Sequence, residues 1–370
     1  MANNNDKKVL NVPHLRFPEF TGEWGNHVLQ DVVIFSNGKA HENCVNEDGD
    51  YVLVNSKFVS TNGQVQKRVT SQLSPLCKSQ FVMVMSDLPN GKALAKCYYV
   101  EENNKFTLNQ RICSFTAKAG NISRFLMYQI NRNKYYMRFD DGINQTNLKK
   151  NEVLSCPVFI PSIKEQEKIA TLLHLIDKRI ATQNKIIEKL QSLIKGLAAQ
   201  LTQSGTPNVR LCDCLECHSS TLQENCVSAT GSYPVYGATG LIGYTNGYAY
   251  NGESILIVKD GSGVGSLSYA NDCYSVIGTL NYLTAKGKYS VLYLYYALMA
   301  FNFTPYITGM AIPHIYFKDY GKAKVFCPSI ENQIRIASLL HNIEQKLVVE
   351  QNLIISLSAQ KSYLLRMLFI

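Results

Sequence analysis

The densest group of potential metal ligands in the sequence is a short run at Cys212, Cys214, Cys217 and His218. Thiolate and imidazole groups hold structural zinc, but such a site needs convergent ligand pairs at a defined spacing. A second pair at finger or ribbon spacing is absent from the sequence. The eleven cysteines are scattered and odd in number, which is typical of reduced thiols. We therefore expect no metal site and no disulfide framework.

Two other motifs have the outline of a catalytic site but lack essential parts of one. The stretch Gly261-Ser-Gly-Val-Gly265 is rich in glycine, but it lacks the lysine of a phosphate-binding loop and is not clearly followed by a helix. Glu344-Gln-Lys346 has the Glu-x-Lys form of some nucleases, without the acidic partner upstream. We predict no catalytic residues and no cofactor.

Cations, aromatic rings and amides gather in several loops instead. Residues 131–139 interleave three cations with three aromatics, and an Asn/Gln-rich run follows at 142–147. Arg and Lys bind phosphates or guanine edges, and Asn and Gln pair with adenine. For any single residue an ordinary solvated loop is the alternative. The candidate DNA-binding residues are Lys57, Arg68, Arg124, Arg132, Lys134, Tyr135, Arg138, Asn144, Gln145, Tyr244, Tyr248, Lys259, Ser262, His314, Tyr316 and Lys318.

The composition is that of a folded protein with more than one domain. The chain has 370 residues, 46% of them hydrophobic and 18% charged, which exceeds the usual size of one core. No apolar run is long enough for a membrane span, and the first residues lack the apolar region of a signal peptide. We expect a cytoplasmic location. The net charge of +9 suits a polyanionic partner, although residues 205–327 are neutral.

An internal repeat is the strongest signal in the sequence. Residues 161–174 match 328–341 at an offset of 167, with nine of fourteen positions identical. A second offset of 182 links the domain starts, where the tetrapeptide ENCV at 42–45 recurs at 224–227. Several such matches in the same order indicate a tandem duplication.

Each repeat ends in a predicted long helix, at 161–204 and 328–370. Apolar residues recur there in steps of four and three over about five heptads, which favours a coiled coil over a helix packed singly on its own domain. We expect the two helices to pair antiparallel, with Gln183 and Glu350 meeting in the seam and setting its register, and Lys361 extending outward to solvent. The helix-pairing residues are Ile176, Ile180, Gln183, Ile187, Leu190, Ile343, Leu347, Glu350, Ile354 and Leu357.

The segments between the helices predict an α+β domain in each repeat. Short β-rich runs such as Ser254-Ile-Leu-Ile-Val are flanked by Gly, Asn or Asp, and the pieces around 124–130 and 291–300 indicate short helices. The predicted fold is therefore two α+β recognition domains separated by an antiparallel two-helix coiled coil with a pseudo-twofold repeat. The domain ranges are 1–160, with an N-terminal tail at 1–20, and 205–327.

Three sequence motifs are similar to motifs of a known family. They are the opening LRFPEFTGEW at 15–24, the Pro-Ser-Ile-x-x-Gln-x-x-Ile-Ala pattern at 161–170 and 328–337, and the preceding stretches that begin at Gly142 and Gly309. With them the chain resembles the specificity subunits of type I restriction-modification systems over essentially its whole length. The second copy has Asn332-Gln333 where the family usually has Glu-Gln, a change that we expect to affect contact with a partner.

The resemblance implies a non-catalytic subunit that reads double-stranded DNA. Each recognition domain would read one half of a split target, and the helices would set the gap between the halves. The implied partners are two modification subunits, which methylate adenine, and restriction subunits, which cleave DNA with ATP.

Two alternatives stay open at this point. One is a scaffold whose two domains bind proteins across a coiled coil. The other is a self-contained methyltransferase or nuclease with unrecognised motifs. Salt-sensitive duplex binding separates DNA recognition from the scaffold, and an assay of the chain alone for methyl transfer or cleavage tests the enzyme.

Overall fold

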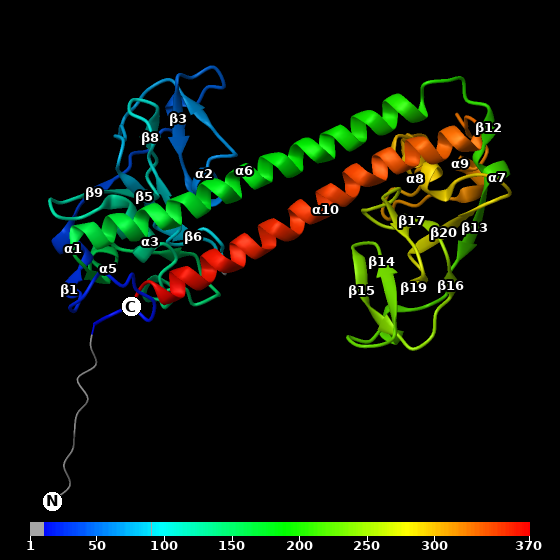
Figure 1. Cartoon of the computed structure of the whole chain (residues 1–370). Helices are drawn as coiled ribbons and strands as arrows, with labels where there is room; N and C mark the ends of the chain where they lie inside the picture. Colours follow the sequence, from blue (N-terminus) through cyan, green and yellow to red (C-terminus); the bar gives the residue numbers. More distant parts are fainter. Residues whose placement is uncertain (1–10, 90) are drawn as a thin grey trace, which may run out of the picture. The chain divides into compact units, whose positions relative to one another are not determined.

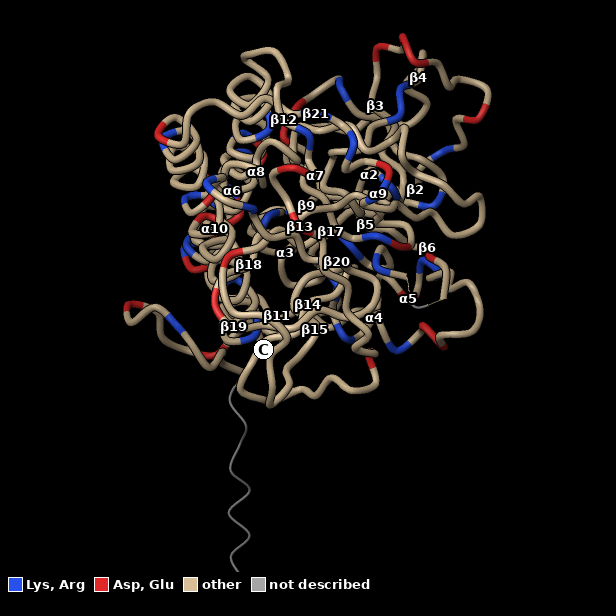
Figure 2. The backbone as a smooth tube through the Cα atoms, turned by 90° about the vertical axis from the view of Figure 1, so that its right-hand side faces the viewer, with Lys and Arg blue, Asp and Glu red and all other residues tan. Residues whose placement is uncertain are grey.

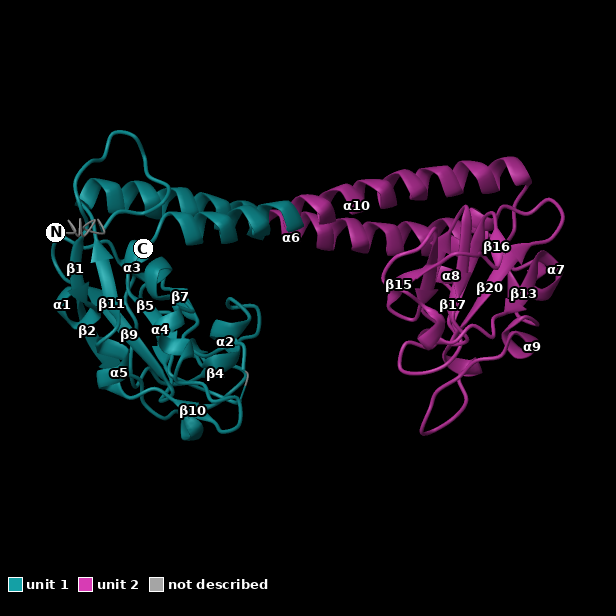
Figure 3. Cartoon of the chain, turned by 90° about the horizontal axis from the view of Figure 1, so that it is seen from below, with its two compact units in different colours: residues 1–181, 355–370 teal, residues 182–354 magenta. Residues whose placement is uncertain are grey.

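The computed structural model describes residues 11–89 and 91–370, which form two compact units (Figure 3). Unit 1 comprises Met1–Ala181 and Ile355–Ile370, and unit 2 comprises Thr182–Ile354. Both long helices are therefore divided between the units, whereas the sequence predicted each helix as a separate segment. The first ten residues of the predicted N-terminal tail lie outside the described residues.

Unit 1 contains a four-stranded sheet, a three-stranded sheet, a two-stranded ribbon made by its first and last strands, and a short pair of strands, β6 (Ser86–Asp87) and β10 (Thr146–Asn147) (Figure 1). The larger sheet has the order β2 (Val33–Asn37), β9 (Ile112–Ala117), β5 (Phe81–Val84) and β7 (Cys97–Tyr99), all antiparallel. The smaller has the order β4 (Arg68–Val69), β3 (Tyr51–Val54) and β8 (Phe106–Leu108). The ribbon pairs β1 (Gly25–Val28) with β11 (Pro157–Ile160). The short helices are α1 (Leu29–Val32), α2 (Ser56–Ser60), α3 (Ser123–Ile130), α4 (Lys134–Met137) and α5 (Lys150–Leu154).

Unit 2 repeats this topology. Its first sheet has the order β13 (Leu215–Ser219), β20 (Leu280–Ala285), β17 (Ser254–Val258) and β18 (Leu267–Ala270). Its second has the order β15 (Gly240–Thr245), β14 (Tyr233–Gly237), β19 (Cys273–Val276) and β16 (Tyr250–Asn251). The ribbon pairs β12 (Val209–Arg210) with β21 (Lys324–Val325), and the short helices are α7 (Leu211–Cys214), α8 (Val291–Met299) and α9 (Phe317–Tyr320). In both units the second sheet contains one parallel pair, β3 with β8 and β14 with β19.

One inner strand of the first sheet in each unit, β5 in unit 1 and β17 in unit 2, is buried on both faces. In β5, Phe81 and Met83 join the core beneath α3, and Val82 and Val84 join the core shared with the smaller sheet. Strand β17 divides in the same way between the two cores of unit 2. Successive side chains of a strand point to opposite faces, so a continuous apolar run such as that of β17 serves two cores at once.

The long helices are α6 (Ile163–Thr202) and α10 (Ile330–Met367), within the predicted ranges (Figure 1). In unit 1 the start of α6 packs with the end of α10, and in unit 2 the end of α6 packs with the start of α10, so the segments run antiparallel in each unit. None of the ten predicted pairing residues is exposed, and Gln183, Glu350 and Leu357 are buried. Basic and acidic residues are interspersed along both helices (Figure 2).

Two polar contacts join the paired helices. The Gln183 amide donates a hydrogen bond to the Glu350 carboxylate in unit 2, and the Lys346 ammonium lies 2.5 Å from the same carboxylate. In unit 1 the Lys361 ammonium forms an ion pair of 2.5 Å with Asp177 on α6. The expectation that Lys361 extends outward to solvent is therefore wrong, because the antiparallel register brings Asp177 within its reach.

A buried glutamine ties the start of each long helix to its own unit. Gln166 accepts a hydrogen bond from the Ile122 backbone N–H at 2.9 Å and donates to the Pro161 carbonyl at 3.0 Å. Gln333 accepts from the Ser290 backbone N–H at 3.1 Å and donates to the Pro328 carbonyl at 2.8 Å. The repeated Pro-Ser-Ile-x-x-Gln pattern therefore encodes the junction between the long helix and the loop before the short helix.

Candidate nucleic-acid interface

In unit 1, two short strands bring distant loops together. Strand β6 (Ser86–Asp87) pairs antiparallel with β10 (Thr146–Asn147), so the loop after β6 lies beside the loop before β10. The Asp87 carboxylate accepts hydrogen bonds from the backbone N–H groups of Ala93 and Leu94, at 2.6 and 3.0 Å, which closes the first loop. The described residues 87–89, 91–94 and 138–147 thus lie side by side, and we call them the unit 1 loop site.

The second loop of this site is held by its own aspartates. Asp141 accepts from the backbone N–H groups of Ile143 and Asn144, at 2.9 and 2.8 Å, and from the Asn144 side chain at 3.0 Å. These hydrogen bonds lower the pKa of Asp141 to about 2, so the carboxylate stays charged at neutral pH. Asp140 accepts from the Gly142 backbone N–H at 3.0 Å. The tip is therefore shaped by local hydrogen bonds.

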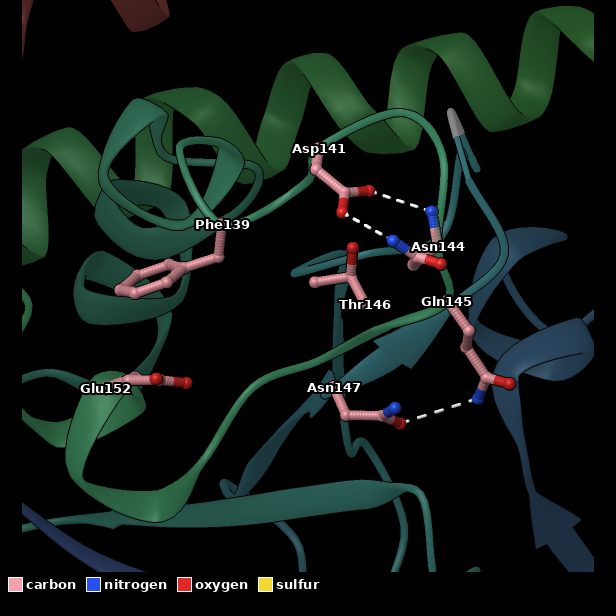
Figure 4. Close-up of a pocket in the computed structure, with 7 residues that line it drawn as sticks. All are labelled: Phe139, Asp141, Asn144, Gln145, Thr146, Asn147 and Glu152. Carbon is pink, nitrogen blue, oxygen red and sulfur yellow. Dashed lines mark hydrogen bonds between the residues drawn. The ribbon is translucent and has the colours of Figure 1, made fainter.

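A hollow of about 180 Å³ opens in the unit 1 loop site (Figure 4). Its lining residues are Phe139, Asp141, Asn144, Gln145, Thr146, Asn147 and Glu152. The amide of Gln145 donates to the Ser86 hydroxyl at 2.8 Å. Amides and carboxylates are donors and acceptors of the kind that pair with base edges. Asp141 and Asn147 extend the set that the sequence indicated; nothing in their types set them apart from other loop residues.

Cations predicted from the sequence border this site. Lys134 is exposed on α4, and the Arg138 guanidinium lies 4.0 Å from the centre of the Tyr135 ring. Arg132 donates to the carbonyls of Gly91 and Leu94, at 3.3 and 3.1 Å, and so ties α3 to the first loop. The structure therefore brings Arg132, Lys134, Tyr135, Arg138, Asn144 and Gln145 together in one region of unit 1.

Unit 2 builds its loop site at the equivalent place, from residues 259–265 and 307–318. The Ile315 backbone N–H donates to the Lys259 carbonyl at 2.9 Å, just as that of Leu148 donates to the Met85 carbonyl at 2.8 Å in unit 1. Thr308 and His314 pair across a narrow hairpin whose tip is 309–313. The predicted residues Lys259, Ser262, His314, Tyr316 and Lys318 all belong to this site.

The side chains of the unit 2 site include aromatic and cationic groups, next to the exposed apolar side chains of Met310 and Ile312. The rings of His314 and Tyr316 lie 5.2 Å apart, and the Lys318 ammonium is 5.1 Å from the centre of the Tyr316 ring. The glycine-rich stretch 261–265 leads into strand β18 and not into a helix. The glycines shape one loop of the site.

Five predicted residues lie away from the loop sites. Lys57 is on α2, and Arg68 on β4 donates to the Gly49 carbonyl at 3.1 Å. Tyr244 is on β15, and the ring of Tyr248 packs against Tyr233 at 4.9 Å. These four residues belong to the part of each unit built around its second sheet, which contains β3 in unit 1 and β14 in unit 2.

Arg124, the fifth, is directed toward the long helix. Its guanidinium donates to Glu101 at 2.7 Å, hydrogen bonds with the ring of His174 on α6 at 2.9 Å, and lies 3.7 Å from the centre of the Tyr99 ring. These contacts engage the guanidinium within unit 1.

Within residues 11–89 and 91–370, no group of three or more His, Cys, Asp or Glu side chains is arranged to hold a metal ion. All eleven cysteines are free thiols, and burial raises the pKa of Cys217 to about 11. Over the same described residues, every helix is too short or too polar to cross a membrane.

Comparison with known families decides the identity of this architecture. The family model for the type I restriction modification DNA specificity domain matches residues 21–192 and 208–359. The chain belongs to this family. The two matched segments coincide with the two repeats, which confirms the tandem duplication and the resemblance drawn from the sequence motifs.

Curated relatives match over part of their length. The chain is 27% identical over 112 residues to the type I restriction enzyme EcoprrI specificity subunit of Escherichia coli, covering 30% of this chain and 28% of that one. It is 30% identical over 138 residues to the putative specificity subunit S.MpnORF285P of Mycoplasma pneumoniae, covering 35% and 43%. The alignments thus span less than half the length of either relative.

Solved structures match over nearly the whole chain. The S subunit of a type I system from M. genitalium superposes with a TM-score of 0.72 at 17% identity, covering 97% of this chain and 99% of that one. A chain from a type I R-M system, solved to explain complex assembly and conformational transition, gives a TM-score of 0.50 at 15% identity, covering 94% and 97%. At these identities the likeness confirms the predicted fold class.

Proposed function

We propose that this specificity-family protein reads a bipartite sequence in double-stranded DNA, one half with each unit, and performs no catalysis itself. The supporting observation is that one chain builds the same loop site twice, on the same topology, with different side chains. A repeated framework with divergent reading loops suits two related domains that bind different half-sites.

The contents of the two sites support duplex DNA as the ligand. In unit 1, Lys134 and Arg138 border a polar hollow that includes Asn144 and Gln145. Cations at such a border bind phosphates and position the protein, while amides read base edges. In unit 2, the site presents Lys259, His314, Tyr316 and Lys318 in place of the amides. The two half-sites should therefore differ in sequence.

The long helices are proposed to set the gap between the half-sites. Helix α6 is continuous over 40 residues, and at about 1.5 Å per residue such a helix extends about 60 Å. Its pairing with α10 includes the Gln183–Glu350 contact and the Asp177–Lys361 ion pair. Polar seam contacts of this kind fix the register of paired helices.

The remaining parts of this proposal concern partners and location. We propose that the chain acts in the cytoplasm with two modification subunits and with restriction subunits, which methylate or cleave the DNA that it selects. One solved structure with this fold comes from work on assembly of a type I R-M system. An assay of the purified chain alone for methyl transfer and DNA cleavage should give no activity, and activity in either assay would contradict the non-catalytic role.

Selection from a random duplex library with the full chain tests DNA recognition directly. The expected result is an enriched sequence with two specified blocks separated by an unspecified gap, bound with an affinity that falls steeply as salt rises. Exchange of residues 205–327 for those of another family member should change one block only. A failure to enrich any sequence would favour a protein-binding scaffold and overturn the proposal.

A further inference from the structure

The two most exposed large apolar side chains among the described residues occupy the same position in the repeat. Ile143 is 80% exposed and Met310 is 106% exposed, and they are related by the offset of 167 that relates the long helices. Single exposed apolar residues are common on protein surfaces. Two that are this exposed, at equivalent tips of the two loop sites, point to a shared role.

Each tip is built to hold its apolar side chain outward. Gly142 and Gly309 precede the two residues with φ values of +70° and +88°, in the region that favours glycine. A Cβ atom at Gly309 would lie 2.3 Å from the Ile312 carbonyl oxygen, so the tight turn requires glycine there. The Ile143 backbone N–H is bound by Asp141, whereas the Met310 loop is closed by the Thr308–His314 bridge. Different local contacts therefore hold the Ile143 and Met310 side chains in equivalent exposed positions.

The surroundings of Ile143 favour DNA over a protein as its occupant. Asn144 and Gln145 follow it directly, both exposed, and the hollow behind it is lined mainly by polar residues. The core of a protein interface is a contiguous, mainly apolar patch, whereas an apolar side chain within a polar, DNA-facing loop matches the wedges that proteins insert between base pairs. Isoleucine and methionine are both used as such wedges.

We propose that Ile143 and Met310 each insert at a base-pair step of the half-site read by their unit, and unstack that step. This inference rests on the proposed DNA recognition and adds a deformation to it. Unstacking costs less at pyrimidine–purine steps, so each wedge would add sequence preference at a position without base-edge hydrogen bonds.

The test uses the full chain and the duplex that it selects from a random library. Permanganate and diethyl pyrocarbonate, which modify unstacked thymines and purines, are applied to both strands of the free and bound duplex. With the unaltered protein we expect one hyper-reactive step in each specified block. Ile143→Ala should abolish the signal in one block and Met310→Ala the signal in the other, each with a rise in Kd of about tenfold.

Controls separate the wedge from a change in folding. Ile34→Ala and Leu241→Ala remove apolar side chains that are 57% and 52% exposed, one on β2 and one on β15, and should leave both signals and the Kd unchanged. All four variants should melt at the temperature of the unaltered protein, because each side chain is exposed. The Ile143 and Met310 variants also serve as controls for each other.

Two outcomes would overturn the wedge and leave DNA recognition standing. The first is sequence-specific binding without any hyper-reactive step. The second is weakened binding of modification subunits by Ile143→Ala and Met310→Ala with unchanged DNA signals, which would identify the tips as a protein contact. If the unaltered chain enriches no duplex at all, the proposed function fails and the wedge fails with it.

Discussion

In both units a tyrosine on the short helix donates to a carboxylate on the long helix, and in unit 1 a lysine also pairs with that carboxylate. In unit 1, Tyr128 on α3 donates to Asp177 at 2.6 Å, and Asp177 also pairs with Lys361. In unit 2, Tyr295 and Tyr296 on α8 donate to Glu344, at 3.1 and 2.7 Å. At the 167-residue offset, the counterpart of Lys361 is the buried, apolar Ile194.

A second difference lies at the start of each helix. Glu165 is 1% exposed and accepts two hydrogen bonds of 2.8 Å from the Arg16 guanidinium, whereas its counterpart Asn332 is exposed. In unit 1 this glutamate binds the protein's own N-terminal segment. That the change to Asn332 affects contact with a partner stays a prediction. At the positions compared here, the repeat preserves the hydrogen bonds between the short and long helices, and unit 1 has ionic contacts in addition.

The largest expected effect is on the Arg16–Glu165 pair. Arg16→Ala leaves the Glu165 carboxylate buried without its cation, which should lower the free energy of unfolding of unit 1 by about 3 kcal/mol. Hydrogen exchange read separately for each unit measures the loss. The matched change Asn332→Ala in unit 2 should alter stability by less than about 0.5 kcal/mol. Equal losses of stability from Arg16→Ala and Asn332→Ala would contradict the claim that the ion pair stabilises unit 1.

The buried glutamines should behave alike in the two units. Gln166→Ala and Gln333→Ala each leave a half-buried backbone N–H and a carbonyl without this partner, which should lower the free energy of unfolding of the affected unit by about 1 kcal/mol. The same exchange measurement reports both. A large loss of stability in one unit with none in the other would show that the two glutamines do not make equivalent contacts.

The polar contact between Gln183 and Glu350 should lower the stability of the paired helices and fix their register. Replacing both Gln183 and Glu350 with leucine removes a buried polar pair, so the melting temperature should rise while the helices gain alternative registers. Cysteine cross-linking along α6 and α10 detects those registers. A single set of cross-links, identical to that of the unaltered protein, would argue against the register role.

The smallest expected effect is a pH dependence of unit 1. Burial, followed by the charge of Arg124, lowers the pKa of His174, so the folded state prefers the neutral ring. The unfolded state binds the proton more readily, and unit 1 should therefore lose stability as the pH falls through about 6.5 and below. His174→Gln should remove this slope in unit 1. A slope that persists in the variant would assign it to other groups.

The sequence predicted the parts of the fold that have a repeating pattern. The heptad steps of α6 and α10 and the offset of 167 are visible without a structure, and the continuous apolar run Ser254-Ile-Leu-Ile-Val became strand β17 at the expected residues. Pairing of Lys361 with Asp177 was missed, because it depends on the register between two helices that the sequence gives only approximately.

The loop sites were only partly predictable. Types and spacing identified Asn144, His314 and their neighbours as candidates. The unit 1 site, however, is assembled by β6 and β10, strands of two residues with no detectable periodicity, and the unit 2 site by the isolated Thr308–His314 bridge. Arg124 resembled a free cation because its partners Glu101 and His174 are distant in the chain. Ile143 and Met310 were overlooked since exposure, which distinguishes them, is a property of the folded chain.

Insertion of one heptad into α6 and one into α10, at paired positions beside Gln183 and Glu350, tests the central claim most directly. Seven residues lengthen a helix by about 10 Å, which corresponds to at most about 3 base pairs of duplex. Selection from a random duplex library should return the same two specified blocks with a wider gap between them. An unchanged gap, or altered blocks, would contradict the claim that the paired helices set the spacing and the loop sites read the sequence.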